Sequence, residues 1–194
     1  MSKLSICVYC GSRSGELAAY ADAARRVGTH IGEQGWQLVY GGGRAGLMGI
    51  VADAALAAGA PVVGVIPESL MGRELGHRGL TELHVVETMH QRKMLMAQRC
   101  DAFLALPGGI GTFEELFEVW SWRQLGYHDK PLGLLNVAGY YDALLRFLAS
   151  SREQGFMSDA QIDLLQVSDE PQALLGRLGE LAPQATAADD YRRI

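Results

Sequence analysis

The sequence has little of what several classes of protein need. Its 194 residues include three cysteines, an odd number that gives no framework of disulfide bonds. Seventeen Lys and Arg stand against 22 Asp and Glu, a net charge of −5 that disfavours nucleic acid as a partner, because phosphate backbones select basic surfaces. No apolar stretch reaches membrane-spanning length, and the N-terminus lacks the apolar core and cleavage site of a signal peptide. We therefore expect a cytoplasmic protein that contacts neither a membrane nor nucleic acid.

The composition is that of a globular protein, with 48% hydrophobic and 20% charged residues. A chain of this length buries about two thirds of its unfolded surface as one domain. We expect a single domain over residues 1–182 and a flexible tail over 183–194. From Ser158 onward the pattern is helical and offers no chemistry.

Strand-like and helix-like segments alternate along the chain. The expected strands are Leu4–Tyr9, Trp36–Tyr40, Pro61–Ile66, Leu83–Val86, Ala102–Leu106 and Leu132–Val137. The expected helices are Glu16–Gln34, Leu47–Ala58, Thr88–Arg99, Thr112–Leu125 and Tyr140–Gln154. Short, wholly apolar strands between helices indicate a parallel sheet covered on both sides, since a strand buried on both faces cannot alternate apolar and polar residues. The predicted fold class is α/β, a Rossmann-like doubly wound parallel sheet with helices on both faces.

Three glycine-containing loops follow strands of this sheet, at the edge where open α/β folds bind ligands. Glycine lets the backbone approach a ligand closely, and a helix N-terminus supplies unpaired N–H groups, so each loop is a candidate anion site. Tight turns alone are the alternative explanation, most of all for the first loop. The candidate contacts are Gly11 and Ser12 in Cys10–Ser14, Gly42 and Gly43 in Gly41–Gly46, and Gly108–Thr112 in Pro107–Thr112. Thr112 stands at an expected helix start, where its hydroxyl either caps the helix or donates to a phosphate oxygen.

The second loop has a competing interpretation. Gly41-x-Gly43-x-x-Gly46 matches the dinucleotide-binding fingerprint, and Glu68 lies about 20 residues further on. Two features weaken this match: it follows the second strand rather than the first, and Glu68 comes directly after Pro67, so we expect it in a loop.

The pair Cys7-x-x-Cys10 resembles half a metal site or a redox pair. It lies in the first expected strand instead of opening a helix, and no second pair follows. We therefore favour a structural role for both cysteines and expect Cys100 to fill the core.

Charged residues cluster at the start of two expected helices. Glu114 and Glu115 follow the third glycine loop, and because adjacent helical residues point in different directions, one of them can face a cleft while the other packs or caps. The segment from Met89 to Lys93 opens another helix. Arg92 and Lys93 are either an ordinary solvated face or part of a site, and the second is favoured because cations at a helix N-terminus oppose the helix dipole at a cost that a nearby anion would offset.

Taken together, these motifs resemble the LOG family of phosphoribohydrolases, long mislabelled as lysine decarboxylases. The family's PGGxGTxxE motif is Pro107–Glu115 here, its Met-His-x-Arg-Lys motif is Met89–Lys93, and its glycine loop lies within Tyr40–Gly49. The resemblance runs from Cys10 to about Gln154.

The resemblance implies hydrolysis of the N-glycosidic bond of AMP or of N6-substituted adenosine 5′-monophosphates, the cytokinin-activating reaction, which gives a free base and ribose 5-phosphate. It implies that Arg92 and Glu115 are catalytic, that no cofactor or metal is needed, and that the protein is a homodimer with its active site near the subunit boundary. The nucleotide-binding positions would be Glu74, Met89, Lys93, Gly108, Gly109, Ile110, Gly111, Thr112, Glu114 and Ser121.

Three other functions compete with this one. The first is a nucleotide-processing hydrolase with a different substrate preference. A non-catalytic nucleotide or dinucleotide sensor would keep the glycine loops but has no need for Arg92 and Glu115. Lysine decarboxylation is rejected, because a pyridoxal-phosphate enzyme needs a Schiff-base lysine and a phosphate cup in a much larger chain.

Overall fold

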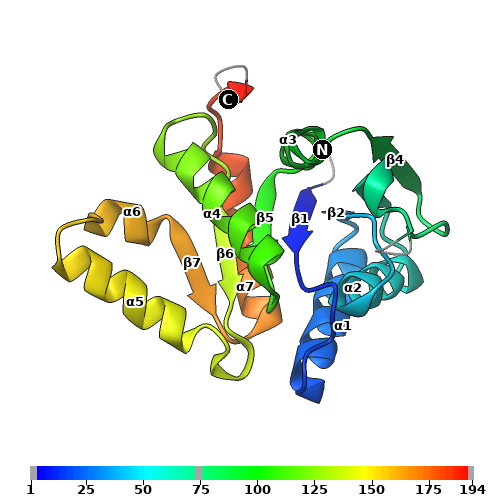
Figure 1. Ribbon diagram of the computed structural model, residues 1–194, viewed down its shortest axis with the longest axis horizontal. Helices are drawn as coiled ribbons and strands as arrows, with labels where there is room; N and C mark the ends of the chain where they lie inside the picture. Colours follow the sequence, from blue (N-terminus) through cyan, green and yellow to red (C-terminus); the bar gives the residue numbers. More distant parts are fainter. Residues whose placement is uncertain (1–3, 73–75, 192–194) are drawn as a thin grey trace.

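Seven parallel strands form the sheet of the computed structural model, which describes residues 4–72 and 76–191 (Figure 1). The strands are β1 (Ser5–Tyr9), β2 (Gln37–Tyr40), β3 (Val62–Pro67), β4 (Glu82–Val86), β5 (Ala102–Ala105), β6 (Leu132–Leu135) and β7 (Leu165–Ser168). Their order is β4-β3-β2-β1-β5-β6-β7, and each neighbouring pair is parallel. The inner strands are apolar and buried almost throughout, as a sheet covered on both faces requires.

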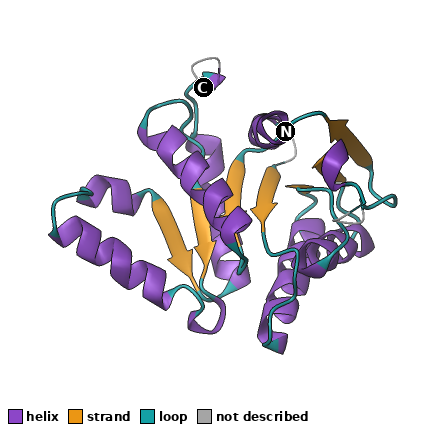
Figure 2. Cartoon of the chain, viewed as in Figure 1, coloured by secondary structure: helices purple, strands orange, loops and turns teal. Residues whose placement is uncertain are grey.

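Helices cover both faces of the sheet (Figure 2). They are α1 (Ala18–Glu33), α2 (Gly46–Ala57), α3 (Met89–Gln98), α4 (Ile110–Gln124), α5 (Asp142–Glu153), α6 (Asp159–Asp163) and α7 (Pro171–Leu181), with 3₁₀ turns η1 (Glu68–Leu70), η2 (Val137–Gly139) and η3 (Ala182–Gln184). Buried residues of α1, α2 and α7 form one core cluster, and those of α3, α4 and α5 form a second. The predicted doubly wound α/β fold is confirmed. Within the described ranges, no helix is long and apolar enough to cross a membrane.

The cysteines lie in the core. Cys7 belongs to the cluster beneath α3 and α4, whereas Cys10 belongs to the cluster beneath α1 and α2, and both are buried and free. Side chains in clusters on opposite faces of the sheet do not form a redox pair, so the structural interpretation of Cys7-x-x-Cys10 is confirmed. Cys100 is also buried, as expected.

The strand order reverses between β1 and β5. The chain leaves β1 through α1 toward β2, and it leaves β5 through α4 toward β6 on the other side. Because α1 and α4 cover opposite faces, the loops after β1 and β5 diverge and open a crevice at the C-terminal edge of the sheet.

The expectation of a purely helical chain after Ser158 was wrong. The segment contains a strand, β7, which pairs with β6 at the edge of the sheet. In β7 only Leu165 is buried, while Gln166 and Ser168 are half-buried and Val167 is exposed. An edge strand with one buried apolar residue lacks the continuous apolar run by which the inner strands were predicted.

Helix α4 begins two residues earlier than expected, at Ile110, with Gly109 as its N-cap. Thr112 is therefore the third helical residue rather than a cap. Glu114 and Glu115 consequently lie in the second turn, beyond the unpaired N–H groups of the first.

The described part of the tail lies against the body of the domain. Lys130 Nζ contacts Asp189 Oδ2 at 2.6 Å, and Tyr191 is buried. These contacts are at the edge of the sheet where the strands begin, opposite the crevice (Figure 1). The domain boundary at 182 and the flexibility of 183–194 stay predictions.

Candidate active site

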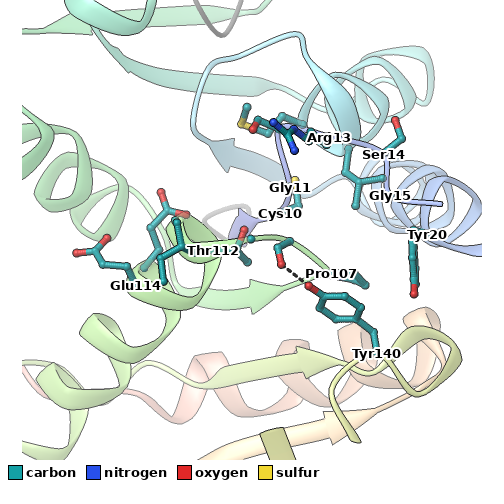
Figure 3. Close-up of a pocket in the computed structure, with 18 of the residues that line it drawn as sticks. Cys10, Gly11, Arg13, Ser14, Gly15, Tyr20, Pro107, Thr112, Glu114 and Tyr140 are labelled. Carbon is teal, nitrogen blue, oxygen red and sulfur yellow. Dashed lines mark hydrogen bonds between the residues drawn. The ribbon is translucent and has the colours of Figure 1, made fainter. Parts of the chain in front are cut away.

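A cavity of about 530 Å³ lies at the crevice between the loops after β1 and β5 (Figure 3). Its size and its place at the switch point of the strand order are typical of small-molecule sites in this class of fold. It is lined by Cys10–Gly15 and Pro107–Thr112, together with Tyr20, Leu47, Met48, Met89, Arg92, Glu114, Glu115 and Tyr140.

The start of α4 forms one wall of the cavity. Among the described residues no side chain caps this helix, and Phe113 N donates to the N-cap carbonyl, Gly109 O, at 3.1 Å. The N–H groups of Ile110, Gly111 and Thr112 precede that bond and have no partner within the helix. With the positive end of the helix dipole, they make this wall suited to an anion.

Gly108 is constrained to be glycine by Thr112. A Cβ at Gly108 would lie 2.1 Å from Thr112 Oγ1, so a side chain there would expel the threonine. Thr112 is almost fully buried and lines the cavity.

Arg92 is held in place by hydrogen bonds to two main-chain carbonyl groups. Its Nε donates to Val65 O at 3.0 Å and its Nη2 to Gly41 O at 2.7 Å. Nη1 lies 3.7 Å from the sulfur of Met89. Arg92 is 4% exposed and lines the cavity, so its guanidinium presents a fixed positive charge in a poorly hydrated place.

Glu115 and Glu114 point in different directions, as adjacent helical residues must. Glu115 is half-buried and lines the cavity. Cys10, at the end of β1, lines the same cavity, and burial, followed by the negative charge of Glu115, raises the pKa of its thiol. Glu114 is exposed; it lines the cavity and bonds to Lys93.

Lys93 ties α3 to α4. Its Nζ bonds to Glu114 and lies 2.9 Å from Glu118 Oε1. Burial alone would lower the pKa of Lys93, but the hydrogen bonds and negative charges of the two glutamates together raise it. The Lys93 side chain is therefore protonated and positively charged at neutral pH.

The structure brings together most of the residues singled out from the sequence. Those that line the cavity are Gly11, Ser12, Met89, Arg92, Gly108, Gly109, Ile110, Gly111, Thr112, Glu114 and Glu115. Gly42, Gly43, Lys93 and Ser121 lie outside its lining. Glu74 lies outside the described residues.

The glycines of the dinucleotide-like motif serve contacts within the protein. A Cβ at Gly41 would lie 2.3 Å from Arg92 Nη2, and one at Gly46 would lie 2.4 Å from Arg13 N. Gly43 pairs with Gly76 across a β-bridge. Close approach by neighbouring protein atoms therefore accounts for Gly41 and Gly46, and the dinucleotide interpretation loses its main support.

Two aromatic residues of the lining were missed in the sequence. Tyr20 comes from α1 and Tyr140 from the turn after β6, and their rings meet edge to face with centroids 5.6 Å apart (Figure 3). Neither lies in a glycine loop. The one available signal for Tyr140 was its place after a strand, at the edge of the sheet where ligands bind.

Comparisons with known proteins agree on one family. A protein-family model described as "Possible lysine decarboxylase" matches residues 48–178. The cytokinin riboside 5'-monophosphate phosphoribohydrolase LOG3 of Arabidopsis thaliana is 48% identical over 178 residues, which cover 92% of this chain and 83% of that protein. The chain belongs to the LOG family. The LOG protein of Oryza sativa subsp. japonica, which carries the same activity name, is 48% identical over 92% of this chain and 74% of its own.

The match to the LOG family is longer than the motifs indicated. They ended at about Gln154, whereas the family model continues through β7 and into α7, to residue 178. The expectation that the chain after about Gln154 lies outside the resemblance was therefore wrong.

Solved structures of other proteins share the fold. The molybdenum cofactor carrier protein of Chlamydomonas reinhardtii superposes with a TM-score of 0.72 at 21% identity, over 94% of this chain and 99% of that one. A molybdenum cofactor binding protein of Rippkaea orientalis gives a TM-score of 0.71 at 19% identity, over 93% and 98%. At such identities the likeness shows the fold alone.

Proposed function

We propose that this protein hydrolyses the N-glycosidic bond of adenosine 5′-monophosphates, with or without an N6 substituent, to a free base and ribose 5-phosphate. The observation that carries the proposal is the convergence of Arg92, Glu115 and the start of α4 on one cavity. It is supported by 48% identity to proteins named cytokinin riboside 5'-monophosphate phosphoribohydrolases.

The 5′-phosphate belongs at the start of α4 in this proposal. The N–H groups of Ile110, Gly111 and Thr112 offer hydrogen bonds there, and the loop around Gly108 and Gly109 allows close approach. Ser12 and Arg13 line the same cavity from the loop after β1, and Arg13 adds a second positive charge.

Glu115 acts on the sugar. As the C1′–N9 bond breaks, positive charge develops on the ribosyl centre, and a carboxylate beside it stabilises that charge or takes a proton from the attacking water. The water oxygen keeps one proton and becomes the C1 hydroxyl of ribose 5-phosphate, and the departing base gains the proton that the water loses. Arg92 either orients the nucleotide or stabilises the departing base.

Lysine decarboxylation, the activity in the family model's description, does not fit the cavity. A pyridoxal-phosphate enzyme forms a Schiff base with a lysine in its active site. Within the part of the chain that the structure describes, no lysine lines the cavity; Lys93 is held by two glutamates and Lys130 lies at the opposite edge of the sheet.

The protein is further proposed to be a homodimer that uses the exposed face of α4. Ile110 is 84% exposed, and Phe117 and Leu125 follow on the same side with Ser121 between them. Ile110 also lines the cavity, so a subunit covering this stripe would lie beside the active site. Light scattering should give a dimer mass for the wild type and a monomer mass for Phe117→Asp with Leu125→Asp; a monomeric wild type would refute the dimer.

A cytoplasmic location is proposed from the three cysteines, all of which are free, as is usual in reducing compartments. Fractionation of cells that express the tagged protein would check it.

The test of the reaction is chromatography of the purified protein after incubation with AMP and with N6-isopentenyl-AMP. The proposal predicts equal amounts of base and ribose 5-phosphate from at least one of them. Binding of AMP without release of base would instead favour the non-catalytic sensor. The rate ratio of the two substrates reports the preference at N6.

A further inference from the structure

We infer that Tyr140 is a positioning residue that holds the loop between β5 and α4 in the orientation that binds the substrate phosphate. The inference rests on the proposed function, since it gives Tyr140 a role in the part of that site proposed to bind the 5′-phosphate. Its basis is a set of hydrogen bonds to three consecutive carbonyl groups of the loop.

Each of these carbonyls accepts a bond from a different part of the protein. Leu106 O accepts from the Tyr141 hydroxyl at 2.7 Å, and Pro107 O accepts from Gly11 N at 3.1 Å. Gly108 O accepts from the Tyr140 hydroxyl, the dashed line in Figure 3.

Engaging these carbonyls matters because the loop has to meet an anion. A carbonyl oxygen carries partial negative charge, and one turned toward a phosphate would repel it. Hydrogen bonds from these three donors orient the carbonyl oxygens away from the cavity. The N–H groups that follow, at the start of α4, then face the cavity.

The two tyrosines are aimed by the turn that precedes α5. Tyr141 N donates to Asn136 Oδ1 at 2.7 Å, and Asn136 Nδ2 donates to Asp142 at 2.8 Å. Ala138 has a φ of 51°, which is uncommon for a residue with a side chain. These two hydrogen bonds and the conformation of Ala138 fix the geometry of the turn from Asn136 to Asp142. That geometry places the hydroxyl groups of both tyrosines against the loop.

Tyr140 and Tyr141 differ in burial and in their contacts. Tyr141 is buried, and burial raises the pKa of its hydroxyl well above the ordinary range, so it stays a donor to Leu106 O. Tyr140 is 37% exposed, lines the cavity and packs edge to face against both Tyr20 and Tyr141. Removing the Tyr140 hydroxyl should therefore change the loop without disturbing the core.

The test is Tyr140→Phe, which keeps the ring and removes the donor. We expect the KM for AMP and the Kd for ribose 5-phosphate to rise about tenfold, the effect of one lost hydrogen bond, with kcat changed much less. The Kd for adenosine, which has no phosphate, should stay at the wild-type value. Tyr191→Phe removes a hydroxyl at the opposite edge of the sheet and should leave all these values unchanged.

The outcomes separate this inference from the proposed function. An active wild type with unchanged phosphate binding in Tyr140→Phe would overturn the inference alone. A fall in kcat without weaker binding of ribose 5-phosphate would also contradict it. If the wild type released no base, the proposed function would fail, while the ribose 5-phosphate measurement would still decide whether Tyr140 orders the loop for a phosphate.

Discussion

The guanidinium of Arg92 lies directly against the backbone of Gly41. Nη2 donates to Gly41 O at 2.7 Å, and a Cβ at Gly41 would lie 2.3 Å from the same nitrogen. The glycine loop after β2 thus serves the site indirectly, by making room for the arginine and accepting its hydrogen bond.

Gly41→Ala should displace Arg92 and lower kcat for base release by about a hundredfold, the scale expected when a catalytic group moves by about 1 Å. Steady-state kinetics with AMP would measure it. Gly176→Ala is the matched control, because a Cβ there meets no atom within 4 Å. Equal activity of the two variants would show that Arg92 does not need its present position.

The sequence was sufficient to predict the inner strands and most helices, because their signals are local. Buried strands such as Val62–Pro67 are continuous apolar runs, and α3 starts at Thr88 with a complete capping box. The edge strand β7 and the early start of α4 at Ile110 were missed. The first depends on pairing with β6, and the second follows an N-cap glycine, Gly109, which offers no side-chain cap.

The candidate site was predictable where it consists of contiguous motifs and not where the fold assembles it. Arg92, Glu115 and Gly108–Thr112 stand in such motifs and meet in the cavity. Tyr140 comes from a turn with no ligand-binding pattern. The bond between Lys93 and Glu114 joins residues 21 apart in the chain, and nothing local specifies it.

Lys93→Met should reduce the free energy of unfolding by about 1–3 kcal/mol, because it leaves two neighbouring carboxylates, one of them largely buried, without their shared cation. Urea denaturation would measure the loss. Lys93→Arg keeps the charge and should recover most of the stability. If Lys93→Met were as stable as the wild type, the ion pairs between α3 and α4 would contribute nothing to the free energy of unfolding.

His128 should make stability depend on pH in the acid range. Burial, together with the charge of Lys130, lowers its pKa to about 4 against the opposing hydrogen bond to Val119 O. Between that value and the ordinary pKa of about 6.5, the unfolded chain binds a proton that the folded chain does not, so stability rises with pH across this window. The contribution amounts to up to about 3 kcal/mol.

His128→Gln keeps an amide donor for Val119 O and does not titrate. Its free energy of unfolding should fall less than that of the wild type between pH 6.5 and pH 4, as urea titrations at several pH values would show. Parallel curves for the two proteins would contradict a buried, neutral His128.

Truncation after residue 185 should destabilise the protein without affecting the site. It removes Asp189 and Tyr191 from Lys130, whose side chain is 11% exposed, and leaves Ala97 O, at 2.8 Å, as an acceptor for the ammonium. Loss of the carboxylate partner of a buried charge is destabilising. Thermal denaturation should show a lower Tm, while the KM for AMP at a permissive temperature stays unchanged because the cavity is at the other edge of the sheet. An unchanged Tm would favour a tail that is flexible throughout.

The carboxylate of Glu115 is proposed to act on the ribosyl centre, and a comparison of Glu115→Gln with Glu118→Gln tests this role. Both variants neutralise one glutamate of α4, but only Glu115 lines the cavity. We predict that Glu115→Gln loses at least about a thousandfold in base release from AMP while its Kd for AMP stays within about threefold of the wild type, and that Glu118→Gln keeps near-normal turnover. Base release by Glu115→Gln at a rate close to that of Glu118→Gln would contradict the account.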